Sequence, residues 1–307
     1  MTRRRRVGAL AALVGAGLAI AGCGPPGATP GGLSLTISEN FGAKVLQSLA
    51  RSSYSGRDNV MQLITHNLQI VPRADGREVQ AIDGIAQTPG KEWLYYVNGV
   101  RASKGPTKTK VYPGDRIWWD LHDTLVTSVV PAVVGSFPEP FLYGTGGQQL
   151  PLRVECAPPG AAVCNTVINR LHAIGATPFP ALLGGSEETQ TLRVLVGTFS
   201  ELKVDPAAAS LATGPSASGV YARFTSGGSQ LALLGSDGAV ARTLGAGAGL
   251  VAATRFDGSA PIWLITGTDA AGVQAAAGLL DAGDLDDHFA VAVQGTTPLP
   301  IPLGTGS

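Results

Sequence analysis

The sequence predicts an α+β protein in which a short, strand-rich N-terminal domain precedes a C-terminal α/β domain. Three observations predict this class. Short β-forming runs separated by turn residues fill residues 33–123, and strands alternate with capped helices over residues 151–303. The chain also contains 42 Gly and 21 Pro with 44% hydrophobic residues, which is typical of a loop-rich folded protein and argues against disorder.

The first 32 residues predict export and lipid attachment. Four arginines precede an apolar run from Val7 to Ile20, which has the layout of a secretory signal and is too short to span a bilayer comfortably. Ile20-Ala21-Gly22-Cys23 resembles the bacterial lipobox, so we expect cleavage of residues 1–22 and a diacylglycerol on Cys23. The alternatives are an uncleaved anchor and an ordinary secretory signal followed by a chance cysteine. The Pro- and Gly-rich residues 23–32 predict a lipidated tether, which places the protein on the extracytoplasmic face of the cell membrane.

Residues 33–123 contain several short elements. Alternating apolar residues indicate strands, and an Asn-Gly pair between β-forming runs indicates a type I′ hairpin, because both of its central residues need a positive φ. Residues 44–51 fit either a helix or the second arm of a hairpin. The predicted elements are a strand over Leu33–Ile37, a helix over Asn59–Asn67 with Asp58 as its N-cap, a strand and turn over Val79–Ile85, a hairpin of Trp93–Val97 and Val100–Ala102 around Asn98-Gly99, and a strand over Arg116–Asp120.

Three ordered motifs in this domain resemble the transcobalamin-like C-terminal domain. They are Trp93-Leu94-Tyr95-Tyr96-Val97-Asn98-Gly99-Val100, then Val111-Tyr112-Pro113-Gly114-Asp115-Arg116-Ile117-Trp118-Trp119, and the upstream Ala81-Ile82-Asp83-Gly84-Ile85. The resemblance implies a β-grasp-like α+β fold for residues 33–123. In transcobalamins the matching domain helps to cover a corrin ring together with a larger helical domain. This chain has no such helical barrel and no Asp-x-His-x-x-Gly corrinoid motif, so corrinoid binding rests on the resemblance alone and no cofactor is predicted.

Five of the 18 aromatic residues lie on two neighbouring predicted strands of this domain. Because successive side chains of a strand face opposite sides of the sheet, we expect one set to fill the core and the other to form an exposed stacking surface. The amide of Asn98 joins the candidate set, although its turn geometry is sufficient to explain it. The candidate ligand-binding residues are Trp93, Tyr95, Tyr96, Asn98, Trp118 and Trp119.

Residues 124–150 are rich in Val, Phe and Pro, which predicts an extended connector packed against a domain, unlike a free linker. The α/β domain over residues 151–303 follows, and its last strand–helix–strand stretch predicts a β-α-β unit. The whole arrangement also looks like a lipoprotein family of high-GC Gram-positive (actinobacterial) bacteria. The expected elements are strands over Leu152–Cys156, Thr191–Gly197, Leu250–Phe256, Ile262–Thr266 and Phe289–Val293, helices over Asn165–Ile174, Asp205–Leu211 and Ala271–Leu280, and a hairpin series over Val220–Phe224, Leu231–Leu234 and Ala239–Ala241.

Two cysteines remain after Cys23. Cys156 and Cys164 would most simply form a disulfide in an oxidising compartment. The alternative, a zinc site, is poorly supported, because the Cys-x7-Cys spacing matches no zinc signature.

Other chemistry has little support in the sequence. Removing the four signal arginines from 22 basic residues leaves 18 against 22 acidic residues, and we see no basic patch of the kind a nucleic-acid binder needs. His122 and His288 adjoin acidic residues and could bind a metal, but solvated ends of strands or helices are the favoured interpretation. The glycine-rich Gly245–Gly249 leads into a strand, which excludes a dinucleotide loop. No nucleophile and base are paired, so we predict no catalytic residues, no metal site and no enzyme.

The sequence thus predicts a membrane-anchored extracytoplasmic lipoprotein with a non-catalytic role in binding a small molecule or an envelope protein. Its contact with the membrane is the lipid on Cys23, and no nucleic acid is expected as a partner. The alternative is a structural accessory subunit of a membrane transporter complex.

Overall fold

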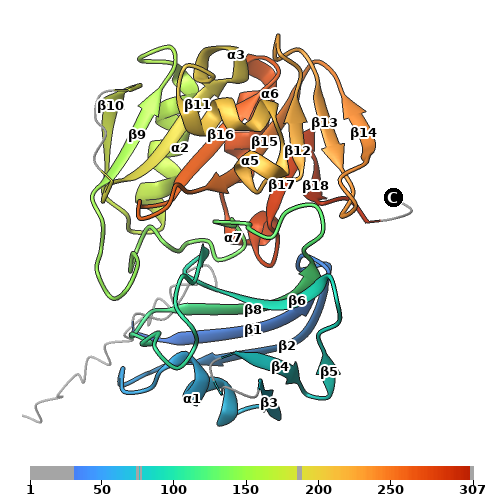
Figure 1. The fold of residues 1–307 in the computed structure, drawn as a ribbon. Helices are drawn as coiled ribbons and strands as arrows, with labels where there is room; N and C mark the ends of the chain where they lie inside the picture. Colours follow the sequence, from blue (N-terminus) through green and yellow to red (C-terminus); the bar gives the residue numbers. More distant parts are fainter. Residues whose placement is uncertain (1–30, 74–75, 77, 185–188, 305–307) are drawn as a thin grey trace, which may run out of the picture.

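The computed structural model describes residues 31–73, 76, 78–184 and 189–304 (Figure 1). Strands account for 38% of the chain and helices for 17%, which places the protein in the predicted α+β class with more strand than helix. The predicted signal, Cys23 and most of the tether lie outside the described residues.

The chain forms two stacked regions joined by the connector of residues 124–150 (Figure 1). The N-terminal region contains the elements from β1 to β8, and the C-terminal region those from β9 to β18. The N-terminal elements are β1 (Leu33–Glu39), β2 (Lys44–Arg51), α1 (Val60–Thr65), β3 (Ile70–Pro72), β4 (Val79–Ile82), β5 (Ile85–Ala86), β6 (Lys91–Val97), β7 (Val100–Arg101) and β8 (Arg116–Asp123).

The main sheet of the N-terminal region has five strands in the order β2-β1-β8-β6-β7. Strand β1 runs parallel to β8, and the other neighbours are antiparallel. Residues 44–51, which fitted two structures in the sequence, form the strand β2 because they pair with β1, with Leu49 opposite Leu35. A second, three-stranded sheet contains β3, β4 and β5.

Helix α1 covers one face of the five-stranded sheet through Val60, Leu63 and Ile64. Its N-cap is Asn59 and not the predicted Asp58. The Asn59 side chain accepts a hydrogen bond from the backbone of Gln62, whose own side chain accepts one from the backbone of Asn59. This capping box satisfies two backbone donors at the start of the helix, which Asp58 could not do one residue earlier.

The C-terminal region is built on a seven-stranded sheet in the order β10-β9-β11-β16-β15-β17-β18. Strands β10, β9, β11 and β16 are parallel, whereas β15 and β18 run antiparallel to their neighbours. Its strands are β9 (Leu152–Cys156), β10 (Pro178–Leu182), β11 (Leu192–Thr198), β12 (Ala222–Phe224), β13 (Leu231–Leu234), β14 (Val240–Leu244), β15 (Ala248–Thr254), β16 (Ile262–Gly267), β17 (Ala290–Gln294) and β18 (Thr297–Ile301).

Two layers cover the faces of this sheet (Figure 1). One face packs against α2 (Ala162–Ala173) and α6 (Ala270–Gly278), and the other against short helices and the three-stranded sheet β12-β13-β14. Helix α6 lies between β16 and β17, which confirms the predicted β-α-β unit. The short helices are α3 (Phe199–Leu202), α4 (Pro206–Ala209), a 3₁₀ turn over Ser210–Ala212, α5 (Pro215–Ser218) and α7 (Ala282–Leu285).

Neither edge strand of this sheet, β10 or β18, was predicted from the sequence. Strand β10 contains Pro178 and Pro180, and β18 contains Pro298 and Pro300. Proline has no N–H to donate to a ladder, so proline-rich segments rarely indicate strands. An edge strand pairs on one side only, which is why both segments are tolerated there.

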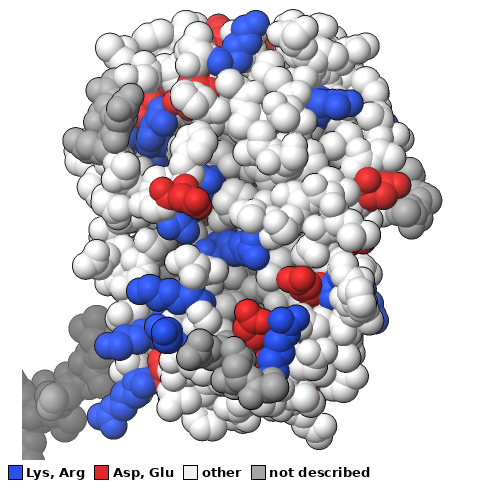
Figure 2. All heavy atoms as spheres, in the orientation of Figure 1, with Lys and Arg blue, Asp and Glu red and all other residues white. Residues whose placement is uncertain are grey.

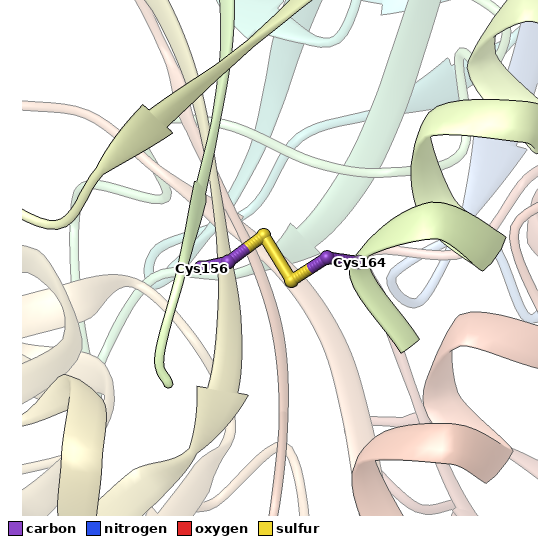
Figure 3. The surroundings of a disulfide bond; sticks show 2 residues. All are labelled: Cys156 and Cys164. Carbon is purple, nitrogen blue, oxygen red and sulfur yellow. A yellow bond between two sulfur atoms is a disulfide. The ribbon is translucent and has the colours of Figure 1, made fainter. Parts of the chain in front are cut away.

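Cys156 at the end of β9 and Cys164 in the first turn of α2 form the predicted disulfide (Figure 3). The two Cα atoms are 6.1 Å apart. Helix α2 begins at Ala162, three residues before the predicted start at Asn165. The bond therefore ties this helix to the parallel sheet.

The connector is packed, as predicted. Val130, Val133, Val134, Phe137 and Phe141 are all buried. Within the described residues, no helix is long and apolar enough to cross a membrane.

Candidate functional site

The predicted ligand-binding residues are all buried. The exposed fractions of the five aromatic side chains lie between 0% and 7%, and Asn98 is fully buried. Alternate aromatic residues do face opposite sides of the five-stranded sheet, but both sides are covered. The expected exposed stacking surface is therefore wrong, because the C-terminal region and the connector cover the second face.

The first face of the sheet carries Trp93, Tyr95 and Trp119, which pack in the core beneath α1. The rings of Tyr95 and Trp119 are stacked with centroids 4.6 Å apart. The indole N–H of Trp93 donates to the carbonyl of Ile85 over 2.9 Å, and the Tyr95 hydroxyl lies 2.8 Å from the hydroxyl of Thr109. Burial raises the pKa of Tyr95 to about 12, so this phenol stays neutral and holds a loop in place.

The second face carries Tyr96 and Trp118, which pack against the C-terminal region. The ring of Phe289 meets Trp118 edge-on at 5.1 Å and Tyr96 at 5.5 Å. Tyr221 and Phe41 complete this cluster, with ring centroids 4.9 Å apart. These contacts explain why the two regions stack on one another.

A polar network lies beside this aromatic cluster. The fully buried Asp120 accepts hydrogen bonds from the Ser38 hydroxyl at 2.5 Å and from the backbone of Phe41 and Gly42 at 2.9 Å each. Its carboxylate also lies 2.8 Å from Nδ1 of His122. His122 is only 1% exposed, so the expected solvated position is wrong: the ring packs against Phe41 instead.

His288 is half-buried, and its burial lowers the pKa of the imidazole. No group of three His, Cys, Asp or Glu side chains in the described parts of the chain is arranged to hold a metal ion.

Asn98 holds the hairpin to its surroundings. With φ at 54° it occupies the left-handed region, as the predicted turn requires. Its side-chain amide donates to Asp115 at 2.9 Å and to the carbonyl of Gly144 at 2.8 Å, and its side-chain oxygen accepts from the backbone of Arg116 at 2.8 Å. Both donors and the acceptor are used within the chain, which leaves the amide to position the hairpin and not to meet a ligand.

Three of the predicted residues nevertheless line a common hollow. Trp93, Tyr95 and Trp119 line a cavity of about 250 Å³, here named the aromatic hollow. Its rim is polar and of mixed charge. The rim residues include Arg73, Glu78, Gln87, Glu92, Arg101 and Lys104.

A second hollow, of about 460 Å³, lies on the other side of the segment Arg101–Lys104. We name it the basic groove, because its lining contains five cationic side chains and no carboxylate among the described residues. Figure 2 shows Lys and Arg side chains gathered on the left of the N-terminal region and towards the junction of the two regions. The groove cations are Arg101, Lys104, Lys108, Lys110 and Arg255.

The basic groove was not predicted from the sequence. Four of its cations lie within ten consecutive residues, Arg101 to Lys110, and this local density was the available signal. Net charge concealed it, since acidic residues elsewhere outnumber the basic ones. The fifth cation, Arg255, is distant in sequence and joins the group only in the folded chain.

A third hollow, of about 470 Å³, lies in the C-terminal region between the start of β11 and the residues before α4. Arg193 and Asp205 line it, together with the exposed side chains of Val204 and Phe256. The guanidinium of Arg193 is already bonded to two carboxylates, those of Glu155 and Asp205. Its charge is thus satisfied within the chain.

Residues 58–123 match the family model described as a domain of unknown function, DUF4430. That family is a transcobalamin-like domain family. The match confirms the resemblance of the N-terminal region at this level, and it spans α1 to β8 while leaving out β1 and β2. Both hollows beside Arg101 lie in this transcobalamin-like segment, apart from the contributions of Thr145, Gly146 and Arg255.

Among solved structures, the chain is similar to a "putative metal binding protein" from Ruminococcus gnavus. The identity is 10%, the TM-score is 0.25, and the alignment covers 30% of this chain and 96% of the other. No curated protein matches the chain.

Proposed function

We propose that this protein is a lipid-anchored extracytoplasmic lipoprotein whose transcobalamin-like domain binds a small polar ligand at the aromatic hollow, without catalysing a reaction. The anchor is supported by the lipobox-like Ile20-Ala21-Gly22-Cys23 behind a basic and apolar leader. The abundance of Gly and Pro and the order of the segments support an origin in a high-GC Gram-positive (actinobacterial) lipoprotein family.

The observation that carries the binding proposal is the convergence of three predicted residues on one hollow. Trp93, Tyr95 and Trp119 line this hollow together with charged side chains that include Glu78, Glu92 and Arg101. Small-molecule sites usually combine aromatic lining residues with a few polar groups that fix the orientation of the ligand.

The size of the hollow limits the ligand. Sites for drug-sized ligands usually enclose about 300–1,000 Å³, whereas the aromatic hollow measures about 250 Å³. A corrin ring would not fit inside it. The proposed ligand is therefore of the size of an amino acid or a monosaccharide, or the end of a larger molecule.

A β-grasp-like fold for the N-terminal region belongs to this proposal. Its support is the strand order β2-β1-β8-β6-β7, with the first and last long strands parallel at the centre and α1 packed on one face. In the same way, the run of parallel strands β10-β9-β11-β16 supports an α/β character for the C-terminal region.

The binding proposal is tested with the chain from Gly24 to Ser307, which contains every described element. Its melting temperature is measured with and without added amino acids, monosaccharides, peptidoglycan fragments, cobinamide and cobalamin. We expect one class of small polar compound to raise the melting temperature, and Glu92→Ala on the rim of the hollow to remove that effect. The matched control is Asp257→Ala, which alters the third hollow and should leave the effect intact. The proposal fails if no compound stabilises the chain, or if Glu92→Ala leaves the stabilisation unchanged.

The anchor is tested separately in cells. Cys23→Ser removes the thiol that accepts the lipid and should shift the protein from the membrane fraction to the medium or to an uncleaved form. Retention of a mature-sized variant in the membrane fraction would contradict the lipid anchor.

A further inference from the structure

The basic groove combines cations from both regions, four from the N-terminal region and Arg255 from the C-terminal region. In the described parts of the chain, no carboxylate lies within 4.0 Å of the side-chain nitrogens of Lys104, Lys108 or Lys110. Among the described residues, the guanidinium groups of Arg101 and Arg255 bond only to backbone carbonyls, those of Ser128 and Ser259. The groove is thus a concave surface of five positive charges.

The groove is positively charged although the chain as a whole has more acidic than basic residues once the signal arginines are removed. Without the four signal arginines the chain has 18 basic and 22 acidic residues, a difference of −4. A protein of this balance would repel an anionic surface if its charges were evenly spread. A groove with one sign of charge instead attracts anions locally.

The groove lies where the described chain begins. The backbone N–H of Gly31 donates to the hydroxyl of Tyr143 at 3.1 Å, and the carbonyl of Gly32 accepts from the backbone of Gly114 at 2.5 Å. Tyr112 and Thr145, which line the groove, are within two residues in sequence of Gly114 and Tyr143. The N-terminal end of the fold and the groove therefore share one corner of the molecule.

The proposed lipid on Cys23 would be close to this corner. Eight residue steps separate Cys23 from Gly31, and a chain of that length spans at most about 29 Å when fully extended. A Pro- and Gly-rich coil of the same length typically spans roughly 15 Å. The lipidated residue thus holds this end of the fold near the membrane surface.

From the charge of the groove and its place beside the tether, we infer that the basic groove docks on the anionic phospholipid headgroups of the membrane that carries the anchor. The position of the groove beside the membrane rests on the proposed lipid anchor. The affinity of the groove for anionic headgroups rests on the five cations alone. Phosphate oxygens of the headgroups accept from the ammonium and guanidinium groups of the groove. Electrostatic attraction between a basic patch and anionic lipids adds to the hydrophobic anchoring by the acyl chains of a lipid anchor.

The test uses the chain from Gly24 to Ser307, without the lipid, and vesicles of phosphatidylcholine with or without phosphatidylglycerol. We expect binding to the vesicles that contain phosphatidylglycerol, weakened by added salt because exposed charges are screened. In the variant Lys104→Glu/Lys108→Glu/Lys110→Glu, binding should fall on the order of a hundred-fold or more, since each cation near an anionic membrane contributes about a fivefold share.

A matched control changes three exposed cations on other faces. Lys203→Glu/Arg223→Glu/Arg242→Glu makes the same change in net charge in the C-terminal region. This variant should bind the vesicles within a few-fold of the wild type, and the melting temperatures of both variants confirm that they fold.

Equal losses in the two variants would overturn the inference, because net charge and not the groove would then control binding. So would equal binding to vesicles without phosphatidylglycerol. Binding of inorganic pyrophosphate at the groove, together with no binding to anionic vesicles, would also overturn it and indicate a soluble ligand. Since the assay uses no lipidated chain, its failure is distinguishable from a failure of the Cys23 test.

Discussion

Glu155 in the C-terminal region and Glu139 in the connector are both fully buried glutamates, and their partners differ. Glu155 accepts two hydrogen bonds from the guanidinium of Arg193, at 2.8 and 2.7 Å. Glu139 accepts one from the backbone of Tyr143 at 2.9 Å, and its other oxygen has no hydrogen-bond partner among the residues that the structure describes. One buried carboxylate is matched by a cation, and the other is not.

The difference shows where the fold tolerates buried charge. In the C-terminal region Arg193 also donates to Asp205 at 2.6 Å, and the hydrogen bonds that Arg193 donates to Glu155 are the main reason that the pKa of Arg193 lies above its ordinary value. At the junction, burial raises the pKa of Glu139 from 4.5 to about 7 and that of Asp115 from 3.8 to about 6. The C-terminal region therefore keeps its buried charges paired, whereas the junction favours protonated carboxyl groups.

The largest expected effect comes from removing the cation of the paired site. Arg193→Met leaves Glu155 and Asp205 buried without their partner, which should lower the free energy of unfolding by about 3–5 kcal/mol. Urea denaturation measures this loss. The matched control is Arg153→Met, because Arg153 lies 3.8 Å from Glu155 and is more exposed. If the two variants lose equal stability, Glu155 does not depend on Arg193 as the geometry indicates.

The buried carboxyl groups at the junction should make the folded chain less stable as the pH rises, whereas a paired carboxylate makes it less stable as the pH falls. Because the folded pKa of Glu139 lies above its ordinary value, its contribution to stability is fully present below about pH 4.5 and is lost as the pH rises through about 7. Glu139→Gln should remove this loss and leave the protein roughly 3 kcal/mol more stable than the wild type at pH 8. Unfolding free energies across this range measure the effect.

Asp269 provides the control of opposite sign. It caps α6, and hydrogen bonds from the backbone of Gly272 and Gly247 lower its pKa. Asp269→Asn should therefore cost stability at neutral pH and progressively less as the pH falls through the range in which Asp269 is protonated. A Glu139→Gln profile that retains the wild-type slope between pH 4.5 and 7 would show that another group controls the junction.

The smallest expected effect extends the comparison to neutral polar groups. The indole N–H of Trp118 donates to the Ser38 hydroxyl at 2.7 Å, whereas that of the neighbouring Trp119 has no hydrogen-bond partner in the described structure. Trp118→Phe should therefore cost about 1 kcal/mol more than Trp119→Phe, since only the first loses a hydrogen bond. Urea denaturation of both variants decides this, and equal losses would mean that the bond to Ser38 contributes nothing.

Much of the fold could be predicted from local patterns. The Asn98-Gly99 turn, the alternation of the aromatic strands and the helix capped by Asp269 each depend on residues that are neighbours in sequence. The disulfide between Cys156 and Cys164 followed from two cysteines close together in the chain. The edge strands β10 and β18 could not be predicted, because their prolines are tolerated only at a sheet edge and the sequence does not show which strands lie there.

The sequence by itself therefore determined the α+β class and the hairpin with its aromatic residues, whereas the tether that ends at Cys23 stays a prediction. Only the tertiary structure decided what each aromatic side chain meets. Because side chains alternate along a strand, Tyr96 and Trp118 lie on the opposite face of the sheet from Tyr95 and Trp119. Whether solvent or protein covers that face depends on whether Phe289 packs there. The basic groove likewise needs Arg255, which lies more than a hundred residues beyond Lys110. Burial and electrostatic fields are sums over neighbours in space, and local sequence does not specify those neighbours.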